Sequence, residues 1–207
     1  MPYTRAALLA PAQSLCNAFA DGSSVSELLT SFTNNPLPTI HEHGHPSFAP
    51  FLGRTFTGRD GVGRYFELLS EYLSISNMSL DPEDQWIVDT ETMAISIRGS
   101  ARFTWKSTGQ AWDETFCYRI GIAEDFPEEQ NGDGGILGGG NKGPLKVQEY
   151  IVWSDTGAAY LARTGKLKEV QDERERSGKE TSRSRERRRS GCGEVVGGGL
   201  GAFGSCR

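Results

Sequence analysis

The chain has 207 residues, which is long enough for one domain with a sizeable hydrophobic core. Hydrophobic residues make up 36% of it, aromatic residues make up 10%, and no stretch approaches the roughly 18 apolar residues of a membrane-spanning helix. The N-terminus is too weakly basic, and its apolar run too short, for a secretory signal. We expect a cytoplasmic protein without a membrane partner, or a nuclear one if its basic tail acts as a localisation signal.

The net charge of −5 is divided unevenly along the chain. Residues 1–165 carry 11 Lys+Arg and 20 Asp+Glu, a net charge of −9, whereas residues 166–190 carry 10 and 6, a net charge of +4. Arginine dominates the run from Arg183 to Ser190, and such a composition cannot bury enough surface to fold. We predict a disordered basic and Gly-rich tail over residues 166–207. A nuclear-localisation or nucleic-acid patch is the alternative, but no aromatic side chains lie between the arginines to stack on bases, so a nucleic-acid partner is not expected.

Apolar residues recur at helical spacing near the N-terminus. Pro11 suggests that the regular helix begins near that residue, and Asp21-Gly22 ends it. The next segment, Ser24-Val25-Ser26-Glu27, has the pattern of a capping box, in which the serine hydroxyl and the glutamate carboxylate each bind a free backbone N–H. It predicts a second, short helix. The periodic apolar residues of the first helix are Leu8, Ala12, Leu15, Cys16 and Phe19.

A third helix is predicted after Thr57-Gly58-Arg59-Asp60, which also has the pattern of an N-terminal cap. Apolar residues recur every three or four positions beyond it, so one face of this helix is apolar along its length. They are Val62, Tyr65, Phe66, Leu69, Tyr72 and Leu73.

Beyond Asp81-Pro82 the apolar period falls to two, which is typical of strands with one buried face. Residues 95–105 and residues 112–119 both alternate in this way and are separated by a turn, so they predict a long hairpin. Residues 147–153 predict a further strand. Three helices followed by antiparallel strands indicate an α+β fold, with the helices packed on one face of a curved sheet.

An acidic, Gly-rich insertion, residues 124–144, precedes the last predicted strand. Seven of the 12 residues from Gly132 to Gly143 are glycine, and Lys142 lies among them, as in some phosphate-binding loops. The segment lacks the GxxxxGK(S/T) pattern and leads into a strand rather than a helix. We interpret it as a flexible hairpin insertion.

Two segments carry a resemblance to a known family. Residues 50–62 read Pro-Phe-Leu-Gly-Arg-Thr-Phe-Thr-Gly-Arg-Asp-Gly-Val, and residues 150–155 read Tyr-Ile-Val-Trp-Ser-Asp. With the order of the predicted helices and strands, they resemble the SnoaL-like branch of the nuclear transport factor 2-like (NTF2-like) superfamily over about residues 5–162. We therefore assign residues 1–165 to a SnoaL-like domain that carries the insertion at residues 124–144.

The resemblance implies a cone-shaped, curved antiparallel sheet whose deep pocket is closed by the three N-terminal helices. Members of the superfamily include polyketide cyclases, ketosteroid isomerases, scytalone dehydratases and binding proteins without catalysis, so the fold does not choose among these activities. The resemblance further implies a small hydrophobic ligand, no cofactor, and a homodimer formed through the open face of the sheet. The outward-facing residues of that face are predicted to be Arg98, Arg102, Thr104 and Arg119.

Two positions match functional residues of the ketosteroid isomerase branch. There, a carboxylate in the first strand removes the substrate proton, and the resemblance places Glu42 at that position. It also places Tyr118 where a later strand supplies a hydrogen-bond donor to the enolate oxygen. The branch has a tyrosine in its first helix where this chain has Leu15, which argues against steroid-type isomerisation.

All three histidines of the chain lie within five residues, His41-Glu42-His43-Gly44-His45. Histidine can transfer protons near neutral pH, so His41 and His43 are candidate catalytic residues beside Glu42. Because side chains alternate along a strand, either Glu42 or the two flanking histidines face the pocket, and the sequence leaves both arrangements open.

The spacing of His41 and His43 would also suit a metal, with Glu149 or Asp113 as a third ligand. No further paired ligands occur in the sequence, and the family seldom needs a metal. We predict a site without a metal.

These patterns predict a pocket protein that acts without a cofactor on a small hydrophobic metabolite, as a cyclase, isomerase or dehydratase. The alternative is a non-catalytic ligand-binding or dimerisation module with the same fold. The two differ in whether the pocket holds a titratable group with a perturbed pKa close to a second polar group. The predicted catalytic residues are Glu42, His41, His43 and Tyr118, and the predicted substrate-binding residues are Phe19, Tyr65, Trp112, Glu114 and Trp153.

Overall fold

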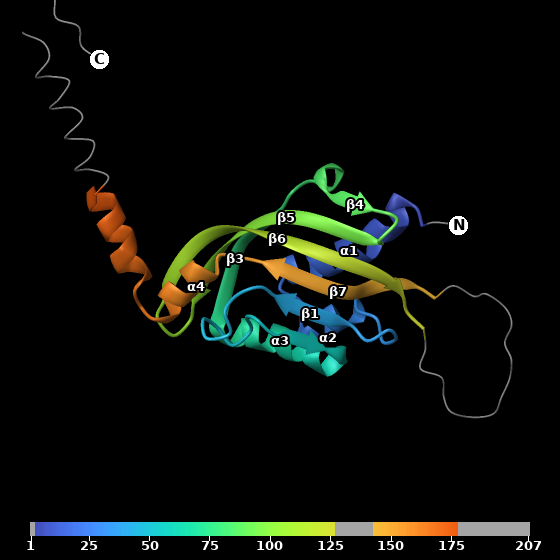
Figure 1. Cartoon of the computed structure of the whole chain (residues 1–207), viewed down its shortest axis with the longest axis horizontal. Coiled ribbons are helices and arrows are strands. Elements are labelled where there is room, and N and C mark those ends of the chain that lie inside the picture. The colour runs from blue at the N-terminus through green and yellow to red at the C-terminus, as the bar shows by residue number, and fades with distance from the viewer. Residues whose placement is uncertain (1–2, 127–142, 178–207) are drawn as a thin grey trace, which may run out of the picture. The chain divides into compact units, whose positions relative to one another are not determined.

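A computed structural model describes residues 3–126 and 143–177 of the chain (Figure 1). The chain divides into two compact units, Met1–Leu167 and Lys168–Arg207. The first unit contains the sheet and all the helices labelled in Figure 1, and the second is helical as far as residue 177. No helix within the two described ranges is long and apolar enough to cross a membrane.

The region predicted to be a disordered tail begins with ordered structure. Residues 167–177 are helical, because they consist largely of Lys, Glu, Arg and Gln, which are strong helix formers. Leu167 is only 6% exposed and belongs to the first unit, so the domain extends two residues beyond the predicted boundary. The arginine-rich run and most of the Gly-rich insertion lie outside the described residues.

The first helix, α1 (Arg5–Ala20), starts earlier than the sequence predicts. The hydroxyl of Thr4 accepts a hydrogen bond from the backbone N–H of Ala7 and so caps the helix. Pro11 consequently lies inside α1 rather than at its start, where it removes one backbone donor without ending the helix.

The predicted second and third helices are α2 (Val25–Thr30) and α3 (Gly58–Tyr72). The capping box of α2 is complete, since Ser24 and Glu27 bind each other's backbone N–H. At the start of α3 the Thr57 side chain makes no capping hydrogen bond, so the cap predicted there is not formed. A 3-10 turn (Glu83–Gln85) and a further helix, α4 (Thr156–Arg163), were not predicted.

In the part of the chain that the structure describes, seven strands form one sheet. They are β1 (Thr39–Glu42), β2 (Thr55–Thr57), β3 (Leu73–Leu80), β4 (Ile87–Asp89), β5 (Ala94–Trp105), β6 (Gln110–Glu124) and β7 (Leu145–Trp153). The order across the sheet is β2-β1-β7-β6-β5-β3, and β4 also pairs with β5. β5 and β6 form the predicted hairpin. β1 runs parallel to β7, so the sheet is mixed rather than wholly antiparallel.

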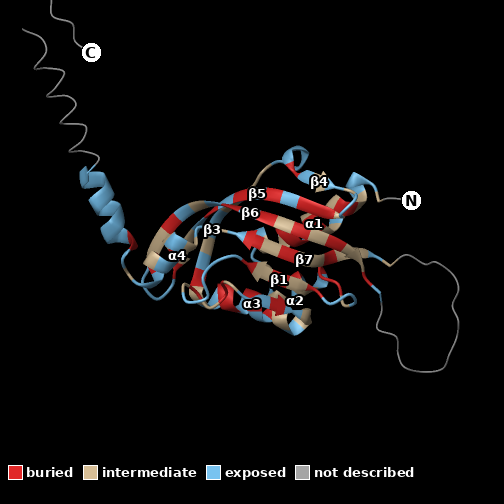
Figure 2. Ribbon diagram, viewed as in Figure 1, coloured by how far each residue is buried: buried red, intermediate tan, exposed pale blue. Residues whose placement is uncertain are grey.

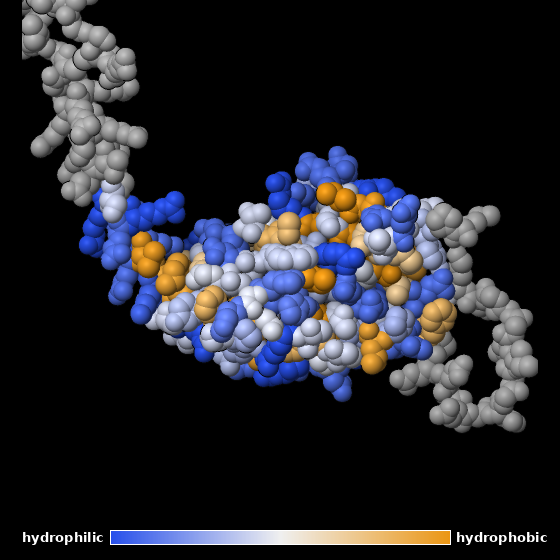
Figure 3. Space-filling view, viewed as in Figure 1, coloured by the Kyte–Doolittle hydropathy of each residue, from blue (hydrophilic) through white to orange (hydrophobic). Residues whose placement is uncertain are grey.

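The sheet curves, and its inner face packs on helices (Figure 1). Alternate residues of β5 are buried over most of its length, as the period of two predicts, and buried positions recur along each long strand in Figure 2. Figure 3 shows the opposite face, where hydrophilic and neutral colours predominate and orange is scattered. The predicted α+β architecture, a curved sheet with three N-terminal helices on one face, is confirmed.

β3 continues directly from α3 and contains a bulge. Its pairing with β5 changes register between Ser76 and Ser79, and Asn77 within this segment has a φ of 53°. Positive φ is uncommon outside glycine, and asparagine tolerates it better than most residues. Since a bulge bends its strand, β3 changes direction beside the end of α1.

A buried carboxylate joins the base of the insertion to the loop that precedes β1. Asp125 is 7% exposed and accepts hydrogen bonds from the backbone N–H groups of Asn34 (2.5 Å) and Asn35 (3.2 Å). It also forms an ion pair with Lys146, at 3.0 Å. Burial acts to raise the pKa of Asp125, but the hydrogen bonds and the ion pair outweigh it and hold the pKa below its usual value. This carboxylate clamp connects three segments that are distant in sequence.

Candidate active site

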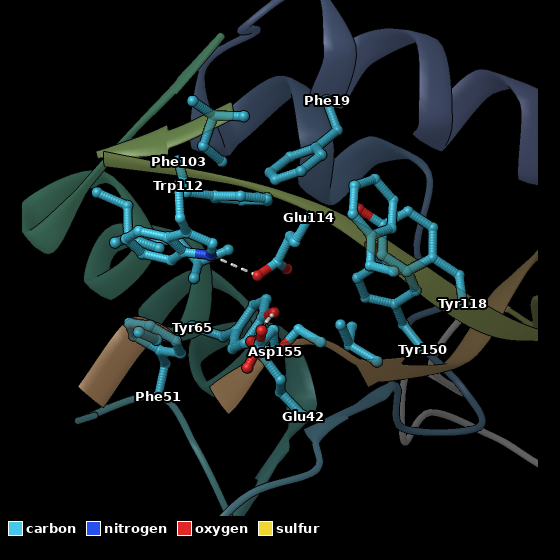
Figure 4. A pocket seen from close by; sticks show the side chains of 17 residues that line it. Phe19, Glu42, Phe51, Tyr65, Phe103, Trp112, Glu114, Tyr118, Tyr150 and Asp155 are labelled. Atoms are coloured by element: carbon cyan, nitrogen blue, oxygen red, sulfur yellow. Dashed lines mark hydrogen bonds between the residues drawn. The ribbon is translucent and has the colours of Figure 1, made fainter. Parts of the chain in front are cut away.

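A pocket lies on the inner face of the sheet, where α1, α3 and α4 approach it (Figure 4). The space between its side chains, including the mouth, is about 480 Å³. Most of its surface is apolar, and three carboxylates, Glu42, Glu114 and Asp155, interrupt it. The aromatic residues that line it are Phe19, Phe51, Tyr65, Phe103, Trp112, Phe116, Tyr118 and Tyr150.

Glu42, the last residue of β1, points into this pocket and is only 5% exposed. The hydroxyl of Tyr65, from α3, donates a hydrogen bond to its Oε2 atom at 2.7 Å. The hydroxyl of Ser154, which follows β7, donates to its Oε1 atom, also at 2.7 Å. Both carboxylate oxygens therefore have a donor, and the donors come from two different elements.

The pKa of Glu42 is raised to about 7, mainly because burial penalises the charged carboxylate. The hydrogen bonds from Ser154 and Tyr65 act in the opposite direction, and the negative charge of Glu114 raises the pKa further. A carboxylic acid with a pKa near neutrality can both accept and release a proton at physiological pH.

A tight turn holds the backbone of Glu42. The backbone N–H of Gly53 donates to the carbonyl oxygen of Glu42 at 2.8 Å. Gly53 has a φ of +67°, and a Cβ atom at this position would lie 2.4 Å from the carbonyl oxygen of Gly44. Only glycine fits such a close approach. This turn explains in physical terms the Leu-Gly-Arg segment on which the family resemblance partly rests.

Glu114, on β6, is the second carboxylate of the pocket and is half-buried. The indole N–H of Trp112 donates to its Oε2 atom at 2.5 Å. Burial is the main cause that raises its pKa. In Figure 4 the side chains of Glu114 and Glu42 extend toward each other from opposite sides of the pocket. Two carboxyl groups with raised pKa values thus share one apolar space and influence each other's ionisation.

Tyr118 and Tyr150 close one end of the pocket. Their rings lie 4.9 Å apart between centroids, and both residues are buried. Burial raises the pKa of each phenol above its ordinary value, so both hydroxyl groups stay protonated and can donate hydrogen bonds. Tyr118 is thereby available as a donor near the carboxylates, as in the predicted arrangement.

The structure brings six of the nine predicted site residues into the pocket: Glu42, Tyr118, Phe19, Tyr65, Trp112 and Glu114. Sequence reasoning missed Phe51, Tyr150, Ser154 and Asp155. The signal for Tyr150 and Ser154 was the segment of residues 150–155, in which alternate side chains from Tyr150 to Ser154 face the pocket. The β-strand period there identifies lining residues once the inward face of β7 is known.

His41, His43 and Trp153 lie outside the pocket, which corrects their predicted roles as catalytic and substrate-binding residues. The ring of His43 stacks on Trp153, with centroids 4.9 Å apart and planes 9° apart. His41 packs edge-on against His43, and its Nδ1 atom is 3.1 Å from the hydroxyl of Thr55. The physical reason is strand alternation, because Glu42 faces inward and its two neighbours must face outward.

No protein-family model matches the chain, and no curated protein matches it. Solved structures match in fold. An NTF2-like protein from Burkholderia xenovorans aligns with a TM-score of 0.52 at 16% identity, over 77% of this chain and 97% of that one. A ketosteroid isomerase-like protein from Erwinia carotovora atroseptica aligns with 0.50 at 13% identity, over 72% and 95%. The pinacolase BvnE from Penicillium brevicompactum aligns with 0.50 at 12% identity, over 82% and 99%.

At these identities the likeness concerns the fold, and the site must be argued from its own residues. The alignments cover nearly all of each matched structure and about three quarters or more of this chain. The chain therefore has the NTF2-like fold that these proteins share.

Proposed function

We propose that this protein catalyses proton transfer on a small hydrophobic molecule, with Glu42 as the general base. The observation that carries the proposal is a buried carboxylate with a pKa of about 7 that opens onto an apolar pocket. In such surroundings a carboxylate is a stronger base than in water, and it is ionised in a large fraction of molecules at neutral pH.

The arrangement suits removal of a proton from a carbon next to a carbonyl group. Glu42 takes the proton, and the electron pair of the C–H bond moves to the carbonyl oxygen to form an enolate. The hydroxyl of Tyr118 is the group available to hydrogen-bond that oxygen. Return of the proton from Glu42 to another carbon gives an isomer. Attack of the enolate carbon on a second carbonyl group of the molecule, whose oxygen takes up that proton, gives a cyclised product. Expulsion of a β-hydroxyl group, which leaves as water with the same proton, gives a dehydrated product.

The proposed reaction uses only side chains of this chain. It states in chemical terms the predicted activity, that of a cyclase, isomerase or dehydratase. The fold is also that of a pinacolase and a ketosteroid isomerase-like protein, which supports an enzyme at the level of analogy. A non-catalytic binding module remains the competing function, and the experiment below separates the two.

The test needs no natural substrate. 5-Nitrobenzisoxazole reports on a base directly: removal of its C3 proton breaks the N–O bond and releases a coloured cyanonitrophenolate. We expect the protein to accelerate this ring opening and Glu42→Gln to lose about a hundredfold or more in kcat/KM, the typical contribution of a general base. The amide keeps the shape of the side chain and loses the proton acceptor.

His43→Asn is the matched control, because His43 is a neighbour on the same strand and faces away from the pocket. It should turn over the probe at the rate of the unsubstituted protein. Loss of activity in H43N with activity retained in E42Q would assign the base to the histidines. Binding of the probe without any acceleration would favour the non-catalytic module.

We also propose that the outer face of the sheet pairs two copies of the chain. Trp153 is 42% exposed there beside His43, and ion pairs such as Arg102 with Asp113 lie along the long strands. Light scattering should give twice the monomer mass of 22.6 kDa at micromolar concentration, and Trp153→Asp should reduce it to that of a monomer. A monomeric unsubstituted protein would contradict the pairing.

A further inference from the structure

A second cavity adjoins the pocket that contains Glu42. Its empty space is about 820 Å³, including the opening to solvent. The last turn of α1, the α1–α2 turn, α2, α3 and β3 surround it. It lies where α1 ends, at Ala20, and where β3 bulges around Asn77.

The two cavities lie side by side and share part of their lining. Phe19, Leu69, Leu73 and Ile75 line both of them. Phe19 is only partly buried, lies on the final turn of α1, and also borders a smaller cavity that contains Tyr118 and Tyr150. Its ring therefore stands at the junction of the spaces on the inner side of α1. Rotation of this side chain is the movement that would open a passage between the two larger cavities.

The chemistry of the second cavity differs from that of the first. Among the described residues no charged side chain lines it, whereas the first contains three carboxylates. Its inner surface includes Leu28, Phe66 and Met78, and exposed polar side chains such as Ser70, Ser76 and Asn77 lie at its rim. Such a surface suits an uncharged, apolar group whose far end can carry a hydroxyl or carbonyl.

We propose that the second cavity binds the apolar body of the substrate while the reacting group of the same molecule lies against Glu42. The substrate is then an elongated lipophilic carbonyl compound, with a chain or fused ring system that passes Phe19, rather than a compact metabolite that the first pocket encloses alone. This inference rests on the proposed function for the identity of the reacting group. The shared wall of the two cavities is independent of it.

A homologous series of phenols tests whether a ligand in the first pocket extends past Phe19 into the second cavity. Each probe carries a straight alkyl chain at the 4-position, from methyl to heptyl, and its hydroxyl can hydrogen-bond the carboxylates of the first pocket. Once the chain passes Phe19, affinity measured by calorimetry should rise about fourfold for each methylene, the factor expected for burial of one such group. An alkyl chain that instead leaves the first pocket through its mouth into solvent would give no rise in affinity with length.

Obstruction of the second cavity supplies the structural control. Ser70 is an exposed residue of α3 on the rim, and Ser70→Phe fills the entrance without touching the first pocket. Affinity for the long phenols should fall to that of the short ones in S70F. Ser74→Phe is the matched variant, because Ser74 is exposed on β3 and lines neither cavity, and it should follow the unsubstituted protein.

Ser76→Phe obstructs the same cavity from β3 and replaces S70F if circular dichroism shows that variant to be unfolded. If the obstructed variant is folded and its affinity still rises with the length of the alkyl chain, the inference is wrong. Turnover of 5-nitrobenzisoxazole, which reports on Glu42 in the first pocket, should be unaffected by S70F. If affinity rises with alkyl-chain length but 5-nitrobenzisoxazole is not turned over, the second binding site is supported and the proposed catalytic function is contradicted.

Discussion

At the scale of single residues, the ionisation of Glu42 is a balance of opposing contributions. Burial and the charge of Glu114 raise its pKa, and the hydrogen bonds from Ser154 and Tyr65 lower it. Neutral substitutions of these neighbours therefore move the pKa of Glu42 in opposite directions while the base itself stays in place.

The ring opening of 5-nitrobenzisoxazole should depend on pH accordingly. In the unsubstituted protein kcat/KM should rise as pH passes through about 7, because the base must be deprotonated. Ser154→Ala removes a donor to the carboxylate and should shift this midpoint upward, whereas Glu114→Gln removes a negative charge and should shift it downward. Shifts of both variants in the same direction would show that these groups do not act on Glu42 as described.

Stability should change with pH for the same reason. In the folded protein the pKa of Glu42 is about 7, above the ordinary value of 4.5. The contribution of Glu42 to the free energy of unfolding is therefore fully present below about pH 4.5 and is lost as pH rises through about 7. The difference of 2.5 pH units corresponds to about 3 kcal/mol of unfolding free energy. Denaturant unfolding should show this loss in the unsubstituted protein and a smaller one in Glu42→Gln. Glu67→Gln, at an exposed position of α3, serves as the control and should retain the full loss.

The sequence predicts the candidates at this scale but not their orientation. Alternation establishes that Glu42 and the flanking histidines face opposite ways, and nothing local decides which side is the pocket. That decision comes from the pairing of β1 with β7 and from the hydroxyl of Tyr65 on α3, which are contacts between distant segments. The same limitation explains why Trp153, one residue before Ser154, was assigned to the wrong face.

At the scale of elements, the clamp at Asp125 fixes the segments around the insertion. Asp125→Ala leaves the backbone N–H groups of Asn34 and Asn35 without their acceptor, and it leaves Lys146 unpaired. We expect a loss of about 2–3 kcal/mol, or about 4–12 °C in the thermal midpoint for a domain of this size. Because the pKa of Asp125 is held below its usual value, the stabilisation is present at neutral pH and is lost in acid, as pH falls through that lowered pKa.

Asp113→Ala is the matched control for that measurement. Asp113 forms an ion pair with Arg102 at 2.7 Å, but its side chain is 73% exposed. Exposed ion pairs contribute about 1 kcal/mol at most, so this variant should unfold close to the midpoint of the unsubstituted protein. Equal losses in the two variants would mean that burial does not distinguish the clamp from a surface pair.

The sequence predicts elements well where a period is long and uniform. The hairpin of β5 and β6, with its period of two, and the amphipathic helix α3 were recognised for this reason. β3 was not predicted because it follows α3 without a turn, so that Leu73 continues the helical period, and because its bulge interrupts the alternation. α1 was shortened in the prediction because a proline was treated as a start, although Thr4 caps the helix earlier.

At the scale of the whole molecule, the end of the domain lies at Leu167. The backbone N–H of Leu167 donates to the side chain of Gln110 at 2.8 Å, and its own side chain is buried. A chain that ends after Leu167 should therefore unfold at nearly the midpoint of the full-length protein. A chain that ends after Gly165 loses this packing, worth about 1.5–3 kcal/mol, and should unfold about 3–12 °C lower. Calorimetry of the two truncations gives the comparison, and equal midpoints would place the boundary at residue 165 instead.

The two donors that hold Glu42 have a consequence for the order in which the protein is made. Tyr65 lies 23 residues after Glu42 and Ser154 lies 112 residues after it, and the strand that β1 joins is the last of the sheet. During synthesis β1 leaves the ribosome long before β7 exists, so its glutamate first meets water and behaves as an ordinary surface acid. The group becomes a base of near-neutral pKa only when the two distant parts of the chain close the sheet, a slow step for contacts of such large sequence separation. Chemical competence thus arrives at the end of folding, and a nascent or partly unfolded chain carries the residues of the site without its reactivity.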